Sequence, residues 1–114
     1  MVTIRRGDVV LVDLNPVVGT EQAGLRPAVI VQSDRANATS PHTIIVPFTT
    51  RIRQALLPSH SVVPAGKGGL DQDSVALCEQ IRAIDKRRIR KVLGHLEGIH
   101  LEEVAKAARA VLDL

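Results

Sequence analysis

The chain up to Cys78 consists mainly of short aliphatic and β-branched runs, separated by proline, glycine or polar turn residues. Such runs are too short for amphipathic helices, but they have the length and composition of β-strands. Ala28–Val31 is apolar throughout, which predicts a strand that is buried on both faces. Several short strands between turns predict a small barrel or sandwich. The predicted strands are Val9–Leu14, Ala28–Val31, Thr43–Phe48, Ser61–Val63 and Ser74–Cys78, with Gln80–Arg82 extending or following the last.

The end of the chain has a different periodicity. Apolar residues from Leu101 to Leu112 recur at helical spacing, opposite charged residues, and predict a C-terminal amphipathic helix. A shorter helix is predicted from Asp85 to Leu93, ended by Gly94. A length of 114 residues fits one domain, residues 1–114, of mainly β structure with helices (α+β).

Composition limits the possible functions. Phe48 is the only residue among Phe, Tyr and Trp, which disfavours a platform that stacks bases on aromatic rings. A net charge of +3 is compatible with a polyanionic partner but does not indicate one. A lone cysteine, Cys78, and four histidines without metal-binding spacing predict no disulfide, no metal and no cofactor. The N-terminal residues lack an apolar targeting segment, so we expect a cytoplasmic protein without a membrane partner.

Three further patterns have simple structural explanations. The glycine-rich stretch Gly66–Gly69 lacks the spacing of a phosphate-binding loop and is expected to be a mobile hairpin tip. The basic segment Arg82–Lys91 is typical of a solvated face, although it can also attract RNA or DNA electrostatically. Cys78 lies in an apolar strand pattern, which favours a buried and unreactive thiol over a nucleophile.

Arg26 and Thr49 stand where predicted strands begin and end. Arg26 precedes Pro27 at the start of the apolar strand, and Thr49 follows the end of another strand. Because proline restricts the backbone there, the five-donor guanidinium of Arg26 is expected at the rim of the barrel. The residues alone leave two possibilities open. Arg26 either pairs with Glu21 or a backbone carbonyl, which is the commoner role of a rim arginine, or it contacts a ligand.

Longer motifs in this sequence resemble the MazF/PemK family of bacterial toxin endoribonucleases. The first two are Arg6–Pro16 and Val17–Gln32, and the second contains Gly-x-Glu-Gln-x-Gly-x-Arg-Pro before an apolar strand. The third is Asp73–Lys86, which contains Glu-Gln-Ile-Arg-x-Ile-Asp-Lys. The resemblance covers nearly the whole chain, and the joint occurrence of these motifs in this order makes chance a poor explanation.

This resemblance implies a fold, an activity and partners. The implied fold is an SH3-like small β-barrel of the CcdB/PemK type with a C-terminal helix. The implied activity is sequence-specific, metal-independent cleavage of single-stranded RNA by its own 2′-hydroxyl, by a type II toxin that inhibits translation and growth. The implied assembly is a homodimer whose RNA groove is blocked by the acidic, disordered tail of a MazE-like antitoxin. Operator DNA is reached through that antitoxin.

The resemblance also assigns roles to particular residues. The catalytic arginine and threonine of the family fall on Arg26 and Thr49. Glu21 matches a glutamate near the active site, and the loop from Val17 to Leu25 is expected to border the RNA, together with the stretch Ser59–Gln72. The substrate-binding residues implied in this way are Thr20, Glu21, Gln22, Ser74 and Gln80.

Two alternatives of other classes remain. A toxin of the same fold that poisons gyrase is one, although such proteins use a tryptophan-bearing C-terminal tail and this chain ends Ala110-Val-Leu-Asp-Leu. The other is a catalytically silent SH3-like module that binds RNA or protein. The presence of both Arg26 and Thr49 in their motifs disfavours the silent module.

Overall fold

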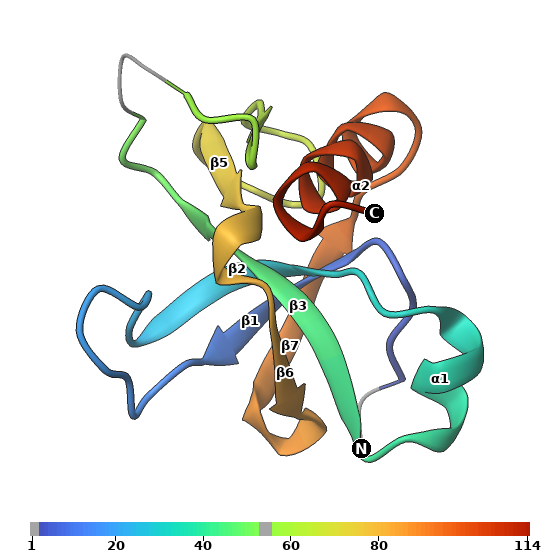
Figure 1. The fold of residues 1–114 in the computed structure, drawn as a ribbon. Helices are drawn as coiled ribbons and strands as arrows, with labels where there is room; N and C mark the ends of the chain where they lie inside the picture. Colours follow the sequence, from blue (N-terminus) through green and yellow to red (C-terminus); the bar gives the residue numbers. More distant parts are fainter. Residues whose placement is uncertain (1–2, 53–55) are drawn as a thin grey trace.

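Seven strands form one antiparallel sheet in the computed structural model, which describes residues 3–52 and 56–114 (Figure 1). The sheet order is β4-β5-β3-β2-β1-β7, and β6 pairs with β3 along the edge that β5 also uses. Among these described strands, β4 and β7 are the two ends of the path and do not pair with each other. The sheet is therefore barrel-like but not closed. The strands are β1 (Asp8–Asp13), β2 (Leu25–Ile30), β3 (His42–Thr49), β4 (His60–Val63), β5 (Ser74–Leu77), β6 (Arg82–Asp85) and β7 (Ile89–His95).

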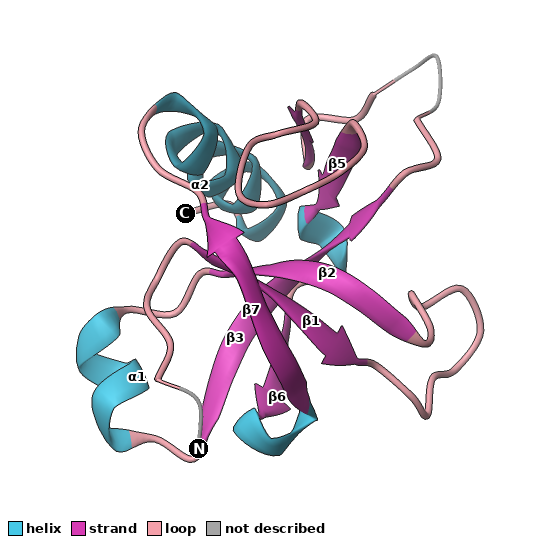
Figure 2. Ribbon diagram, turned by 180° about the vertical axis from the view of Figure 1, so that it is seen from behind, coloured by secondary structure: helices cyan, strands magenta, loops and turns pink. Residues whose placement is uncertain are grey.

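Two α-helices flank the sheet. The C-terminal helix α2 (Ile99–Leu112) packs over one face of the sheet, and the short α1 (Asp34–Thr39) lies away from it, beside the N-terminal segment (Figure 2). Two 3₁₀ turns, η1 (Cys78–Gln80) and η2 (Lys86–Arg88), connect β5 to β6 and β6 to β7. None of the helices in the described residues is long and apolar enough to cross a membrane.

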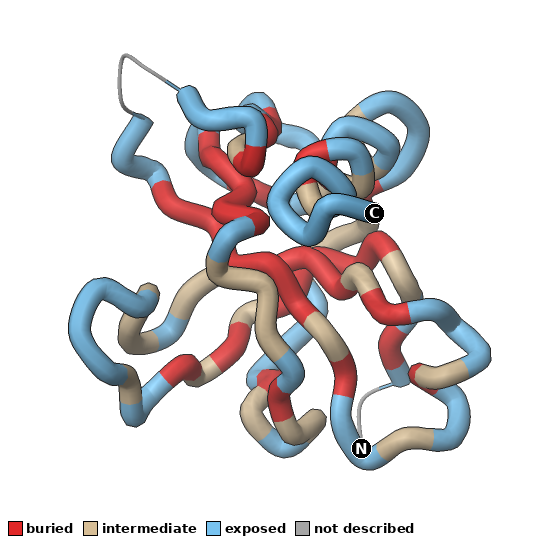
Figure 3. Tube along the Cα trace, viewed as in Figure 1, coloured by how far each residue is buried: buried red, intermediate tan, exposed pale blue. Residues whose placement is uncertain are grey.

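Alternate residues of the strands contribute to two separate hydrophobic clusters, as the period of a strand requires. Figure 3 shows the buried stretches of the strands that contain these residues. One cluster includes Val29, Val46 and Phe48 and is covered by Val104 and Ala107 of α2. The other fills the concave side of the bent sheet, with residues such as Val12, Ala28, Ile30, Ile45 and Ile89. Both faces of β2 are buried over Ala28, Val29 and Ile30, which expose no surface, as the apolar run predicted. Val31, the last residue of that run, lies beyond the end of β2 and is half-buried.

The strand-rich fold class and the C-terminal helix are confirmed, but the predicted helix from Asp85 to Leu93 is wrong. This segment forms η2 and then β7, which pairs with the free edge of β1. Its lysines and arginines have good helix propensity, but the edge of β1 offers backbone hydrogen bonds that a helix here would leave unmade. Helix α1 was not predicted; its start is capped by the Ser33 hydroxyl, which accepts the Ala36 N–H at 3.3 Å.

The glycine-rich turn before β5 packs closely against β7 instead of projecting as a free tip. Gly69 has φ +75°, and a Cβ atom built on it would lie 2.1 Å from the carbonyl oxygen of Leu93. A Cβ on Gly94 would in turn meet the Gly68 carbonyl carbon at 2.6 Å. The two backbones can approach this closely only because both positions are glycine.

Candidate functional site

A cavity of about 970 Å³ lies on the concave side of the sheet, near its edge. Its floor is formed by the ends of β3 and β5, and its walls by the β1–β2 loop, η1 and the segment before β4. These parts are far apart in the sequence, and they leave the sheet on the same side of the molecule (Figures 1 and 2). The described lining residues are Leu14, Thr20, Glu21, Gln22, Pro47, Thr49, Arg51, Leu56, Leu57, His60, Val75, Leu77, Glu79, Gln80, Ile81 and Arg82.

The cavity brings together five of the seven residues singled out from the sequence: Thr20, Glu21, Gln22, Thr49 and Gln80. The remaining two, Arg26 and Ser74, are not among its described lining. Ser74 is buried, and its hydroxyl donates to the carbonyl of Gln72 at 3.0 Å, so its side chain is engaged within the fold. Of the stretch Ser59–Gln72, the described lining includes His60 alone.

Arg26 and Thr49 nevertheless share one face of the sheet. Ala28 of β2 pairs with Pro47 of β3, and this is the last pair of the β2–β3 ladder on that side. Arg26 and Thr49 each lie two residues beyond this pair on their own strands, so the alternation of side chains gives them the same face as the pair. Arg26 also pairs with Val12 of β1, whose side chain lies in the concave cluster. The side chain of Arg26 therefore starts on the concave face, at the side of the cavity where Thr49 lies.

The guanidinium of Arg26 is held by the β1–β2 loop. Its Nε donates a hydrogen bond to the carbonyl of Ala23 at 3.0 Å. Within residues 3–52 and 56–114, no hydrogen bond or ion pair uses its two terminal nitrogens, so the fork that binds oxyanions is available. Of the two structural partners that the sequence left open, the backbone carbonyl is the one observed, and no pairing with Glu21 is formed among the described residues. Glu21 instead accepts the Val18 N–H at 2.6 Å.

Thr49 has the local geometry of a hydrogen-bond donor. Its Oγ1 accepts the backbone N–H of Arg51 at 3.2 Å, which leaves the hydroxyl proton free to point into the cavity. The residue is only 9% exposed, so a ligand that reaches the hydroxyl is largely shielded from water.

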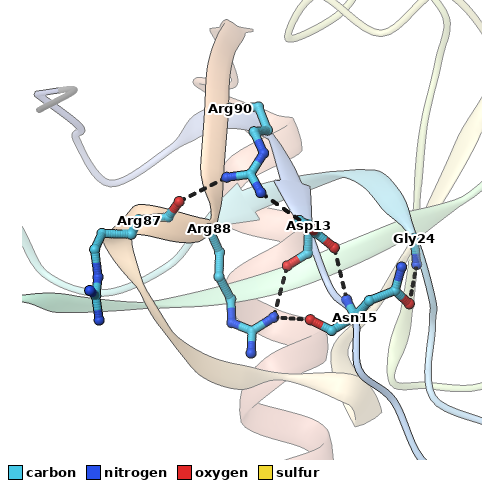
Figure 4. Close-up of polar contacts among 6 residues, drawn as sticks. All are labelled: Asp13, Asn15, Gly24, Arg87, Arg88 and Arg90. Atoms are coloured by element: carbon cyan, nitrogen blue, oxygen red, sulfur yellow. Dashed lines mark hydrogen bonds and ion pairs between the residues drawn. The ribbon is translucent and has the colours of Figure 1, made fainter.

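Hydrogen bonds hold the β1–β2 loop at its base and at its tip, and Figure 4 shows those at the base. At its base, Arg88 donates to the carbonyl of Asp13 at 3.2 Å and also to the carbonyl of Asn15, whose side chain accepts the Gly24 N–H at 3.1 Å. At its tip, the backbone N–H of Gln22 donates to Oε1 of Gln80 at 2.8 Å. These contacts hold the loop residues against the cavity.

Arg88→Ala is expected to weaken this anchoring. Loss of two charge-assisted hydrogen bonds at a partly buried site should lower the free energy of unfolding by about 1–3 kcal/mol. Because the loop would sample other positions, ligand binding in the cavity should weaken as well. Thermal unfolding would measure the first effect, and titration with a short single-stranded RNA, the ligand that the sequence motifs imply, would measure the second. Arg87→Ala is the matched control, since its exposed side chain pairs only with Asp85 in the part of the chain that the structure describes, and it should change neither quantity.

Four ionisable residues of the lining were not singled out as site residues: Arg51, His60, Glu79 and Arg82. Glu79 and Arg82 lie within the motif that carried the family resemblance, so that motif was the available signal. His60 lies in the stretch Ser59–Gln72 that was expected to border the RNA, but no motif marks it or Arg51, and the pairing of β3, β4 and β5 places them at the cavity. The described lining therefore contains two arginines and two glutamates, so its charge is mixed.

Other candidate centres of reactivity are absent from the described residues. Burial, followed by the nearby charge of Glu79, raises the pKa of the Cys78 thiol to about 12, as expected for an unreactive cysteine. Over residues 3–52 and 56–114, no three His, Cys, Asp or Glu side chains gather in an arrangement that could hold a metal ion.

Comparison with known proteins agrees with this arrangement. The sequence profile of a family described as "PemK-like, MazF-like toxin of type II toxin-antitoxin system" matches residues 5–112. The chain belongs to this family. A relative named endoribonuclease MazF, from Staphylococcus saprophyticus subsp. saprophyticus, is 46% identical over 111 residues, which cover 97% of this chain and 92% of that protein.

Solved structures of MazF-like toxins share the fold. The MazF crystal structure (Form-I) from Deinococcus radiodurans superposes with a TM-score of 0.85 at 25% identity, covering all of both chains. An endoribonuclease from a mycobacterial species, solved in complex with its cognate antitoxin, gives 0.82 at 21% identity, covering 97% of this chain and 96% of that one. The small barrel-like sheet with a C-terminal helix is thus the fold of MazF toxins.

Proposed function

We propose that this endoribonuclease toxin cleaves single-stranded RNA sequence-specifically and without a metal, at the cavity beside Arg26 and Thr49. The observation that carries the proposal is the alternation of side chains along β2 and β3 beyond the Ala28–Pro47 pair, which supports a shared face for Arg26 and Thr49 beside the cavity that Thr49 lines. The loop residues Thr20, Glu21 and Gln22 and the η1 residue Gln80 line the same cavity and would contact the RNA.

The reaction needs little from the protein because RNA contains its own nucleophile. The 2′-hydroxyl attacks the adjacent phosphorus, a five-coordinate phosphorane forms, and the bond to the 5′-oxygen breaks. The products are a 2′,3′-cyclic phosphate and a free 5′-hydroxyl. The protein must help to remove the proton from the 2′-oxygen, stabilise the added negative charge and supply a proton to the leaving oxygen.

The described residues can fill these roles. The terminal nitrogens of Arg26 form a planar, permanently charged fork that matches two phosphate oxygens, and the guanidinium can also donate toward the leaving oxygen. The hydroxyl of Thr49 donates to a phosphate oxygen and holds the group in line. Glu21 serves as a base or as a group that positions the RNA. Arg51 and Arg82 in the lining add cationic contacts for neighbouring phosphates.

The wider function follows from membership in the toxin family. The protein acts in the cytoplasm, where cleavage of messenger RNA inhibits translation and growth. It pairs with a cognate MazE-like antitoxin, which blocks the RNA groove, and it reaches operator DNA through that antitoxin. Two copies form a homodimer and build the groove together. A stable monomer at micromolar concentration in size-exclusion chromatography with light scattering would contradict the shared groove.

Cleavage of a long RNA in EDTA tests the proposal directly. The purified protein should cut the RNA at a small number of short motifs, with the metal chelated. The same RNA with a 2′-deoxy nucleotide on the 5′ side of each mapped cut should resist cleavage there, because the nucleophile is missing. Cleavage of the deoxy-substituted bonds would rule out attack by the 2′-hydroxyl. An absence of cleavage in any RNA would favour a silent binding module or a protein-targeting toxin.

A further inference from the structure

A carboxylate stands in a cavity that, on the proposed function, holds a polyanion. Glu79 lies in η1 and lines the cavity, and its side chain is 35% exposed. In the described part of the chain, the carboxylate contacts the imidazole of His60, and no arginine or lysine lies within pairing distance of it. A negative charge here repels phosphate groups, so Glu79 needs a different explanation from that of the arginines in the lining.

The carboxylate is held in one orientation by two donors. Oε1 accepts the hydroxyl of Ser59 at 3.1 Å, and Oε2 accepts Nε2–H of His60 at 2.8 Å. The proton is placed on Nε2 because Nδ1 of His60 accepts the backbone N–H of Leu57 at 3.2 Å. Burial opposes ionisation, but the hydrogen bonds from His60 and Ser59 hold the pKa of Glu79 below its ordinary value. The group is therefore a fixed anion at neutral pH.

Strand register places this pair beside the reaction site and not within it. Thr49 is opposite Val75 of β5, whereas His60 is opposite Leu77, two residues further along the same face. The Cα atoms of Thr49 and His60 are separated by two inter-strand spacings, from β3 to β5 and from β5 to β4, and by two residues along the strand. Together these distances amount to about 12 Å. An RNA bound with its cleaved phosphate at Thr49 would therefore bring a neighbouring nucleotide to the side of the cavity where His60 holds the carboxylate.

A fixed carboxylate in this position suits the edge of a base. Each oxygen of Glu79 has used one of its two lone pairs, so each can accept one more N–H. Adenine, cytosine and guanine offer an exocyclic amino group, whereas uracil presents carbonyl oxygens on both sides of its single N–H. Leu56 and Leu57, both exposed and both in the lining, supply an apolar surface for the base without an aromatic ring.

We propose that Glu79 determines base preference at one position near the cut, where it accepts a hydrogen bond from an exocyclic amino group and rejects uracil. Ser59 and His60 are positioning residues that keep its two oxygens in place. This inference rests on the proposed RNA cleavage and adds a residue that selects the sequence.

Mapping of cleavage motifs tests the inference. The wild-type protein and Glu79→Gln are each incubated with a pool of RNAs randomised around one cut, and the products are sequenced. The wild type should exclude uracil at one position, and Glu79→Gln should lose about tenfold of that discrimination there while keeping its preference elsewhere, because an amide can donate to a uracil carbonyl. Ser59→Ala, which removes the donor to Oε1, should broaden the preference at this one position only. Arg87→Ala, on the exposed surface outside the described lining, should retain the wild-type motif.

Replacing one base of the RNA tests the same inference without changing the protein. The preferred base at the position is replaced by its analogue without the amino group: purine for adenine, 2-pyrimidinone for cytosine, or hypoxanthine for guanine. The wild type should cleave the analogue about tenfold more slowly. An unchanged rate, or a uniform loss of rate in Glu79→Gln with an unaltered motif, would overturn the inference while leaving RNA cleavage intact. Failure of the wild type to cleave any RNA would instead overturn the proposed function on which it rests.

Discussion

Arg26→Ala is expected to lower the rate of RNA cleavage by about 10²–10³ while the protein stays folded. Arg26 is half-buried, and its Nε makes a single hydrogen bond to a loop carbonyl, so its removal costs little stability. In the proposed mechanism its terminal nitrogens stabilise the charge of the phosphorane, and the variant removes them. Single-turnover cleavage of a short RNA containing the preferred motif would measure the rate, and circular dichroism would confirm folding.

Two further variants separate charge from geometry at this site. Arg26→Lys keeps the positive charge but loses the planar fork, so it should recover only part of the rate. Thr49→Ala should also lose about 10²–10³, since it removes a hydroxyl donor at a shielded site, whereas Thr49→Ser keeps that donor and should remain active. Near-normal cleavage by both alanine variants would show that another part of the molecule carries out the reaction.

The strands could be predicted from the sequence because each is a local pattern. Ala28–Ile30 is buried on both faces, and an uninterrupted apolar run predicts such burial without knowledge of the residues that pack against it. The segment Ile89–His95 is different, because its basic residues are compatible with a helix, and only the unpaired edge of β1 makes it a strand. Secondary structure that depends on pairing with a distant segment cannot be predicted from a short stretch of sequence.

The candidate site likewise contains residues that a local motif predicts and residues that only the tertiary structure brings together. Thr20, Glu21 and Gln22 follow one another in a loop whose motif is recognisable, and the motif predicted their place at the cavity. The contact of His60 with Glu79 joins residues that are far apart in the chain, through the pairing of β4 with β5. No spacing in the sequence indicates such a pair. The sequence predicted Arg26 at the rim of the barrel, but only the structure identifies the carbonyl of Ala23 as its hydrogen-bond partner.

The largest effect on stability is expected from Gly69→Ala. A side chain at φ +75° costs about 1–2 kcal/mol, and its Cβ would lie 2.1 Å from the carbonyl oxygen of Leu93, so one of two backbones must move. Overpacking of this kind adds about 1–3 kcal/mol, which gives a total loss of roughly 2–5 kcal/mol in the free energy of unfolding. Chemical denaturation at constant temperature would measure it.

Gly66→Ala isolates the contribution of backbone strain within the same turn. Gly66 also has a positive φ, +89°, but nothing lies within 4 Å of a Cβ built there, so only the cost of about 1–2 kcal/mol applies. If the two variants were equally stable, the contact of the turn with β7 would contribute nothing. The described cavity lining includes no residue of this turn. Cleavage per folded molecule should therefore be unchanged in both variants, and any loss of activity should follow the unfolded fraction alone.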